Sequence, residues 1–172
     1  PKRGDGSGLK SIFQEIVFER SIATMVRAGY LSPLVGKQVF TKIDLASVGI
    51  QHGDFIQADL AKVVNTPSRN QLIADNYRLY AKERKKGLAF CADVQHAKDL
   101  ATTFNLCGIS SCAIFGAMGE EERKKVLADF SDGKFHVLTN CQLLTEGFDE
   151  PSIDCIIMGR PTASTALFTQ MI

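Results

Sequence analysis

The second half of the chain alternates between short apolar segments and polar segments of helical spacing, and this alternation constrains the fold more than any other feature. Four apolar runs have the composition of buried β-strands, and helical segments of about a dozen residues separate most of them. The expected strands cover residues 87–91, 110–115, 135–139 and 154–158, and the expected helices cover 93–105, 119–131 and 164–172. This order predicts an α/β fold, with a mostly parallel sheet and helices on both faces. Right-handed connections then place the loops after Cys91, Phe115, Asn140 and Met158 at the carboxyl edge of the sheet.

The first half of the chain is less regular. Its clearest signal is Thr66-Pro67, because threonine can cap a helix and proline suits the first helical turn. Leu72, Ile73 and Tyr77 then mark one face of a helix that ends in the basic run KERKK, residues 82–86. Upstream we expect a strand at 12–18, a helix at 19–28, an edge strand within 30–48 and a short helix within 53–65.

Composition excludes several classes of protein. With 172 residues, 45% hydrophobic and 23% charged, the chain is typical of a globular α/β protein and not of a disordered one. A net charge of +1 gives no bulk attraction for nucleic acid, so any such surface must be local. Five cysteines without a Cys-x-x-Cys pair indicate reduced packing residues of an intracellular protein, and no apolar run is long enough to cross a membrane.

The segment TEGFDEPSIDCIIMGRPT combines a polar loop, an apolar strand and an Arg-Pro-Thr exit. A glycine and an acid placed directly after a strand favour a ligand site, although both are also ordinary turn residues. The full segment TEGFDEPSIDCIIMGRPTASTALFTQMI resembles motifs V and VI of superfamily 2 helicases, most closely the branch with the XPB-like helicases and the type III restriction motor subunits. GLAFCADVQHAKDLA resembles motif IV of the same proteins.

The resemblance implies a RecA-like P-loop NTPase fold and a two-part chain. Residues 1–35 would be the tail of a first motor domain with its linker, and residues 36–172 a second motor domain (the helicase C-terminal domain) that ends within motif VI. The sequence has no Gly-x-x-x-x-Gly-Lys-Thr phosphate loop, no Asp-Glu metal motif and no motif VI arginines. We therefore expect no catalytic residue and no metal ligand here. This chain alone should not hydrolyse ATP, whereas a full-length parent would use ATP and Mg²⁺.

The resemblance also implies candidate site residues, and some of these residues can be explained by structure alone. The candidates for an ATP cleft are Gly147, Asp149, Glu146, Arg160 and Gln170. The candidates for nucleic-acid binding are Ala92, Asp93, Gly116, Asn140, Cys141 and Thr145, mostly through backbone amides and small side chains. Asp93 can equally cap its helix, Arg160 can be an exposed strand-end charge, and His96 and Phe90 suit packing. Many relatives have threonine near position 141, so a hydroxyl contact there is in question.

These features together favour the second motor domain of an ATP-dependent helicase or translocase that acts on nucleic acid, with DNA preferred. Its partners would be the nucleic acid and the N-terminal motor domain of the same chain, without a membrane. The location would be intracellular, with nucleus, mitochondrion and cytoplasm all open. An RNA helicase of the DEAD/DEAH type is the nearest alternative, although its motif V usually reads Ala-Arg-Gly-Leu-Asp. A Rossmann-like nucleotide-binding module would need a Gly-x-Gly-x-x-Gly turn, which GLAFCADV does not contain, and a non-catalytic interaction domain also stays open.

Overall fold

The computed structural model describes residues 15, 17–144 and 148–172, and the chain divides into two compact units, residues 1–40 and 41–172. Among the described residues of the first unit, the regular element is the helix α1 (Ile22–Arg27), which Ser21 caps by accepting a 3.1 Å hydrogen bond from the N–H of Thr24. This helix confirms the one expected at 19–28, at a shorter length. The expected strand at 12–18 lies mostly outside the described residues, and Glu15, Val17 and Phe18 do not belong to a strand.

The edge strand expected within residues 30–48 is wrong, because none of these residues is in a strand. Pro33 has no N–H to donate, and the apolar side chains of Leu34 and Val35 are exposed and not packed on a sheet. The strands come later, as an antiparallel hairpin of β1 (Ile50–Gln51) and β2 (Asp54–Phe55). Its two turn residues have positive φ angles, 52° at His52 and 82° at Gly53, as a type I′ turn requires.

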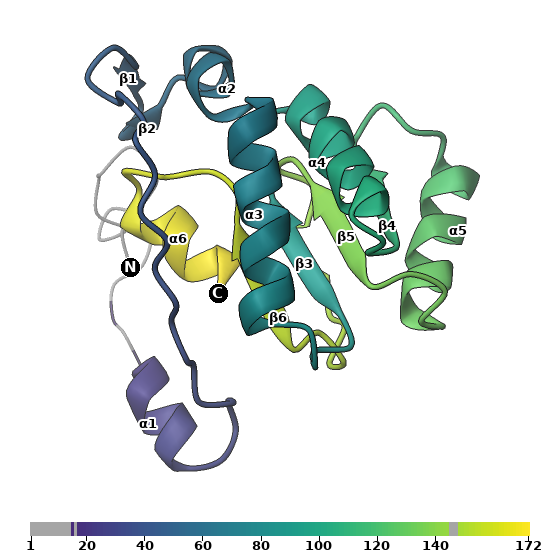
Figure 1. Cartoon of the computed structure of the whole chain (residues 1–172). Helices are drawn as coiled ribbons and strands as arrows, with labels where there is room; N and C mark the ends of the chain where they lie inside the picture. Colours follow the sequence, from purple (N-terminus) through teal and green to yellow (C-terminus); the bar gives the residue numbers. More distant parts are fainter. Residues whose placement is uncertain (1–14, 16, 145–147) are drawn as a thin grey trace. The chain divides into compact units, whose positions relative to one another are not determined.

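The main sheet of the second unit has four parallel strands in the order β4-β5-β3-β6 (Figure 1). The strands are β3 (Gly87–Phe90), β4 (Ser111–Ile114), β5 (Val137–Asn140) and β6 (Cys155–Met158). Phe90 pairs with Asn140 on one side and with Met158 on the other, so these strands end level with one another. The parallel sheet and its carboxyl edge are therefore confirmed.

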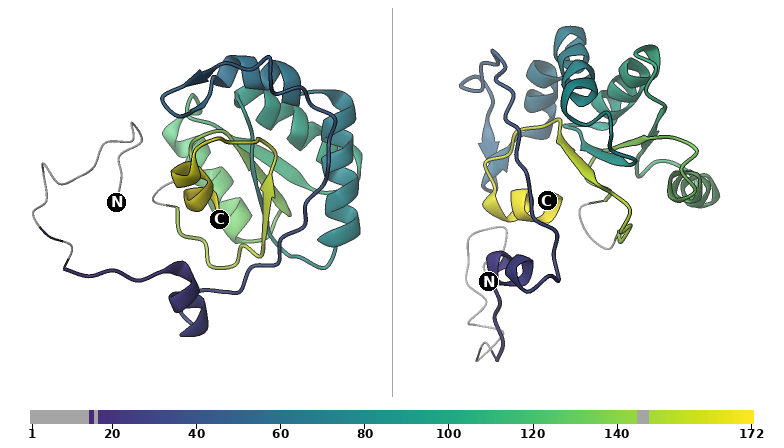
Figure 2. Two further views of the ribbon diagram at one scale, coloured as in Figure 1. Left: turned by 90° about the vertical axis from the view of Figure 1, so that its left-hand side faces the viewer. Right: turned by 60° about the horizontal axis from the view of Figure 1, so that its bottom comes forward.

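Helices cover both faces of this sheet, as predicted (Figure 2). On one face, α3 (Pro67–Tyr80) and α4 (Val94–Leu106) bury Tyr77, Leu100 and Phe104 against Ala89 and Val137. On the other face, α5 (Glu120–Ser131) and α6 (Thr165–Met171) bury Phe130 and Met171 against Leu88, Phe90 and Leu138. The strand side chains alternate between the two clusters, which is why β3 and β5 are fully buried.

The starts of the helices follow from their caps. Thr66 accepts a hydrogen bond from the N–H of Arg69 at the start of α3, with Pro67 in the first turn as predicted. Ser164 accepts a 3.2 Å bond from the N–H of Leu167 at the start of α6. The short helix expected within 53–65 is α2 (Gln57–Val64), which buries Leu60 and Val64. None of the helices in the described part of the chain is long and apolar enough to span a membrane.

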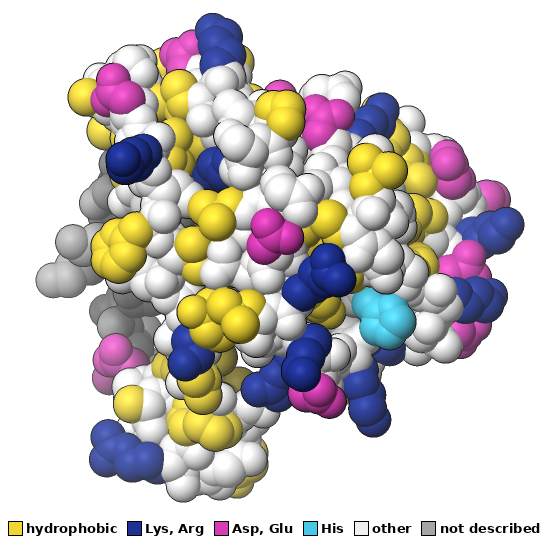
Figure 3. Space-filling view, viewed as in Figure 1, with side chains coloured by type: hydrophobic (Ala, Val, Ile, Leu, Met, Phe, Trp, Pro, Cys, Tyr) yellow, Lys and Arg dark blue, Asp and Glu magenta, His cyan; other side chains and the backbone are white. Residues whose placement is uncertain are grey.

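Lys86 stands apart from the rest of the basic run, because it is buried at the amino edge of the sheet while its neighbours are exposed. Figure 3 shows basic side chains gathered near the lower end of α3, where this run begins. The Nζ atom of Lys86 donates to the carbonyl oxygen of Ser131 at 2.7 Å and to the hydroxyl of Ser152 at 2.6 Å, and it lies 3.5 Å from Oε1 of Glu150. Hydrogen bonds, first from Ser152 and then from Ser131, lower the pKa of Glu150 to about 2, and Lys86 adds to this effect.

We expect the substitution Lys86→Met to destabilise the chain by about 1.5–3 kcal/mol, because it keeps the buried stem but removes a charged donor. The exposed neighbour is the control, and Lys85→Met should change stability by no more than about 0.5 kcal/mol. Urea unfolding of both variants measures the difference. Equal midpoints would show that the buried ammonium does not stabilise the fold.

Candidate functional site

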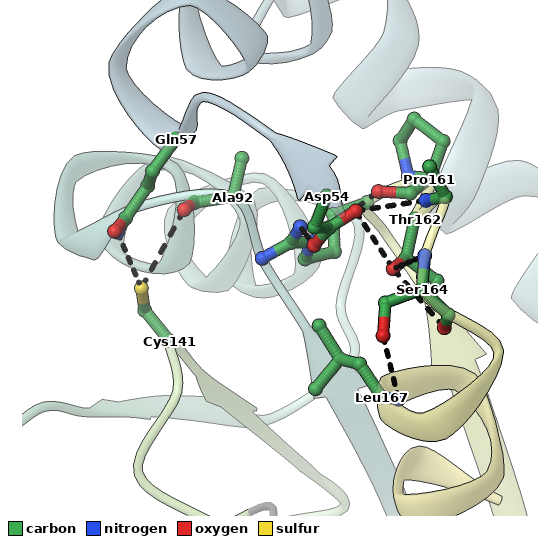
Figure 4. A network of polar contacts seen from close by, with 10 residues as sticks. Asp54, Gln57, Ala92, Cys141, Pro161, Thr162, Ser164 and Leu167 are labelled. Carbon is green, nitrogen blue, oxygen red and sulfur yellow. Dashed lines mark hydrogen bonds and ion pairs between the residues drawn. The ribbon is translucent and has the colours of Figure 1, made fainter. Parts of the chain in front are cut away.

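The carboxyl edge of the sheet brings together the loops after β3, β5 and β6, and the predicted site residues Ala92, Asp93, Cys141 and Arg160 lie at the starts of these loops. Figure 4 shows Ala92 and Cys141 at this edge. In the loop after β3, Ala92 is fully buried, and its N–H donates to Nδ1 of His96 at 3.1 Å. Asp93 caps α4 by accepting a 2.6 Å hydrogen bond from the N–H of His96. The capping reading of Asp93 is therefore confirmed, and the amide of Ala92 is already used inside the chain.

His96 and Phe90 are packing residues, as expected, since they are 0% and 3% exposed. Burial lowers the pKa of His96 to about 4, and the charge of Arg69 adds to this effect. Because Nδ1 accepts the Ala92 N–H, the remaining proton of the neutral ring sits on Nε2, which is buried without a hydrogen-bond partner. The imidazole of His96 is therefore neutral in the folded chain.

The end of β5 carries two further candidates, Asn140 and Cys141, and both are buried. The amide nitrogen of Asn140 donates to the carbonyl oxygen of Ala89 at 3.1 Å, and its Oδ1 accepts from the N–H of Leu144 at 3.4 Å. The thiol of Cys141 lies 3.6 Å from the carbonyl oxygen of Ala92 and accepts from Nε2 of Gln57 at 3.2 Å (Figure 4). Burial raises the pKa of this thiol. The side chains of Asn140 and Cys141 are therefore both engaged in contacts inside the chain.

The exit of β6 is held by Asp54 on β2, a residue that sequence analysis did not select. Its carboxylate accepts from Nη2 of Arg160 at 2.5 Å, from the hydroxyl of Thr162 at 2.9 Å and from the N–H of Ala163 at 2.8 Å (Figure 4). Burial by itself would raise the pKa of Asp54, but the bonds from Ala163, Phe55 and Thr162 and the charge of Arg160 lower it overall. Arg160 is only 3% exposed, so its alternative reading as an exposed charge is wrong.

The remaining candidates lie at the surface or outside the described residues. Asp149, Gly116 and Gln170 are exposed, with Gln170 on α6. Thr145, Glu146 and Gly147 lie outside the residues that the structure describes. A glycine that the sequence reading did not select, Gly159, is required by close approach, because a Cβ there would lie 2.8 Å from the carbonyl oxygen of Phe90.

A model of the helicase conserved C-terminal domain matches residues 68–172. The chain belongs to this family. Its relatives include a Saccharomyces cerevisiae protein named as the ATP-dependent helicase IRC3, 33% identical over 99% of this chain and 25% of the relative. A Schizosaccharomyces pombe protein named as the mitochondrial ATP-dependent helicase irc3 is 35% identical over 99% of this chain and 28% of its own length. The chain thus spans about a quarter of the length of these relatives.

Solved structures support the same fold. The C-terminal domain of the DEAD-box protein Dbp5 is similar with a TM-score of 0.54 and 21% identity, over 63% of this chain and 63% of that chain. At this identity the likeness shows the fold alone. Together with the family match, it confirms the RecA-like architecture of a helicase C-terminal domain that the sequence resemblance implied.

The buried histidine predicts an acid-sensitive fold. The pKa of His96 is lower in the folded chain than its usual 6.5, so the unfolded chain binds the proton more tightly. The stability that comes from the neutral ring is therefore complete above about pH 6.5 and is lost as the pH falls toward 4, by up to about 3 kcal/mol.

We expect His96→Gln to flatten the fall of unfolding free energy between pH 6.5 and 4 relative to the wild type, since glutamine can accept the Ala92 N–H without titrating. Urea unfolding at several pH values measures the slope, and the exposed His136→Gln is the matched control. A slope that His96→Gln leaves unchanged would contradict the buried neutral ring.

Proposed function

We propose that the chain is the second motor domain of an ATP-dependent superfamily 2 helicase or translocase that binds ATP and a nucleic-acid backbone at the cleft between two motor domains. The observation that carries the proposal is that the segment resembling motif IV and the Arg-Pro-Thr exit follow two neighbouring parallel strands, β3 and β6, and so meet at one edge of the sheet, within residues that match the helicase C-terminal family. Ligands of open α/β sheets bind outside the carboxyl ends of the strands, which is this edge.

We assign the ATP side of the cleft to the loop between β5 and β6 and to the exit of β6. By resemblance the exposed carboxylate of Asp149 would accept a hydrogen bond from a ribose hydroxyl, which requires the loop to bring it to the carboxyl edge, because its neighbour Glu150 contacts Lys86 at the amino edge. Gln170 lies exposed on α6 and is assigned to the cleft by resemblance. Arg160 has its guanidinium on Asp54, so it supports the cleft from within. Gly147 and Glu146 complete the proposed cleft by resemblance. Mg²⁺ and the phosphate loop would come from the first motor domain, to which residues 1–35 would connect.

The nucleic-acid side is assigned to the loops after β3, β4 and β5. The side chains of Asn140 and Cys141 and the amide of Ala92 are engaged inside the chain, so contacts there would come from other backbone groups, from the exposed Gly116 and from Thr145. Asp93 would act by fixing the start of α4, whose N-terminal end attracts phosphate. We favour DNA by the resemblance of TEGFD to the DNA-acting branch. RNA stays the alternative, because DEAD-box RNA helicases of Oryza sativa are 32% identical over 51% of this chain.

We also propose an intracellular location and a partner in the N-terminal motor domain of the same chain. The fission-yeast relative is named as mitochondrial, which makes the mitochondrion the first compartment to examine. The division of the chain into two units falls between residues 40 and 41, close to the proposed boundary between linker and second motor domain at residue 36.

The division of labour between two motor domains predicts that this chain alone releases no phosphate from ATP, with or without nucleic acid, whereas the full-length protein does. The measurement is phosphate release from both proteins, each purified alongside a variant of the full-length protein without its phosphate-loop lysine. Nucleic-acid-stimulated turnover by the isolated chain would contradict the assignment as half of a motor.

In the full-length protein, Asp149→Ala should reduce ATP turnover, because a lost hydrogen bond to a positioned ribose costs about 0.5–1.5 kcal/mol and can misalign the cleft. Its thermal melt should hardly move, since exposed substitutions stay within roughly 0.5 kcal/mol. Glu83→Ala is the matched control, an exposed carboxylate in the loop before β3, outside the segments that resemble the helicase motifs. Unchanged turnover with a lowered melting temperature would show that Asp149 is a structural turn residue and would contradict its assignment to the ATP cleft.

A further inference from the structure

Asp54 connects two parts of the chain that are more than a hundred residues apart. Its partner Arg160 lies 106 positions later, and Ala163 lies 109 positions later. Asp54 itself precedes the segment 68–172 that matches the helicase C-terminal family, so the carboxylate comes from the hairpin in front of that segment. The hairpin is a separate two-stranded sheet, so no strand of the main sheet depends on it for pairing.

The contacts of Asp54 continue into the first turn of α6. The hydroxyl of Thr162, which donates to Asp54, accepts a 3.1 Å hydrogen bond from the N–H of Ser164. Ser164 in turn caps α6 through the N–H of Leu167. A single carboxylate therefore holds the strand exit, the turn after it and, through Ser164, the start of the helix that carries Gln170 (Figure 4).

A second contact holds the residue directly before Arg160. Nη1 of Arg69, in the first turn of α3, donates to the carbonyl oxygen of Gly159 at 2.6 Å. Gly159 packs so closely on the carbonyl oxygen of Phe90 that no Cβ fits there. The chain before Arg160 is thus fixed by α3 and β3, whereas the chain after it depends on Asp54.

We propose that Asp54 is a positioning residue of the ATP cleft: it pairs with the buried Arg160 and orients the segment from Thr162 into α6, so that turnover depends on a carboxylate outside the conserved domain. This role rests on the proposed function. Without its charge, the guanidinium of Arg160 stays buried and unpaired, which is costly unless the segment moves. Because the main sheet keeps its own core, the expected result is a displaced β6–α6 segment in a folded domain.

The test uses the full-length protein with saturating nucleic acid, and measures ATP turnover against ATP concentration. Asp54→Asn keeps the shape of the side chain but removes the charge. We expect its kcat to fall about tenfold and its KM for ATP to change less than about threefold, because a small misplacement near the reacting groups mainly affects the transition state. Asp54→Glu restores the charge on a longer stem and should recover part of the loss. The matched control is Asp59→Asn on α2, whose carboxylate pairs with the exposed Lys62 at 2.9 Å.

The outcomes separate the two proposals. A wild type without turnover overturns the proposed function and the role of Asp54 with it, whereas an active wild type with an unimpaired Asp54→Asn overturns the role of Asp54 alone. A loss that Asp54→Glu does not recover, or a loss equal to that of Asp59→Asn, also overturns it. If Asp54→Asn fails to fold, the variant Thr162→Val tests the proposal instead. It removes the hydroxyl that links Asp54 to Ser164 and leaves the ion pair between Asp54 and Arg160 in place. A normal kcat for Thr162→Val then overturns the role.

Discussion

Parallel pairing of buried strands is the constraint on which the rest of this structure depends. Phe90, Asn140 and Met158 are register partners, so three strands that are far apart in sequence end at one line. Helices on both faces exclude water from the strands, and this leaves the loops at the strand ends as the places where polar groups can meet a ligand. The segments that follow Phe90, Asn140 and Met158 begin at this edge because the topology places them there.

Some polar groups at this edge are engaged in contacts inside the chain, and others are exposed. Asn140 bonds to β3 through the carbonyl oxygen of Ala89, the thiol of Cys141 contacts the carbonyl oxygen of Ala92, and the amide of Ala92 donates to His96 on α4, so these groups fix the loops to the sheet and to α4. Asp54 and Arg160 form a buried ionic contact at the carboxyl edge, and Lys86 and Glu150 form one at the amino edge. Such buried groups stabilise a fold only when each has its partner, so both pairs favour one arrangement over its alternatives.

Local signals were sufficient to predict most of the second unit from the sequence. The alternation after Gly87, the Thr66-Pro67 start of α3 and the cap at Asp93 all depend on residues close together in the chain. The hairpin was missed because His52-Gly53 is less typical of a type I′ turn than Asn-Gly. The Asp54–Arg160 contact spans 106 positions, and no local pattern encodes such a pairing. For the same reason Arg160 reads in sequence as a cleft residue or a surface charge, although it is buried.

Hydrogen exchange of the full-length protein tests most directly whether the carboxyl edge is the functional face. Exchange would be compared without ligand and with a non-hydrolysable ATP analogue plus single-stranded DNA. The account predicts slower exchange in peptides that cover residues 91–96 and 159–164, at the carboxyl edge, and no change in peptides that cover 82–86 and 134–136, at the amino edge. Protection at the amino edge with an unchanged carboxyl edge would contradict it.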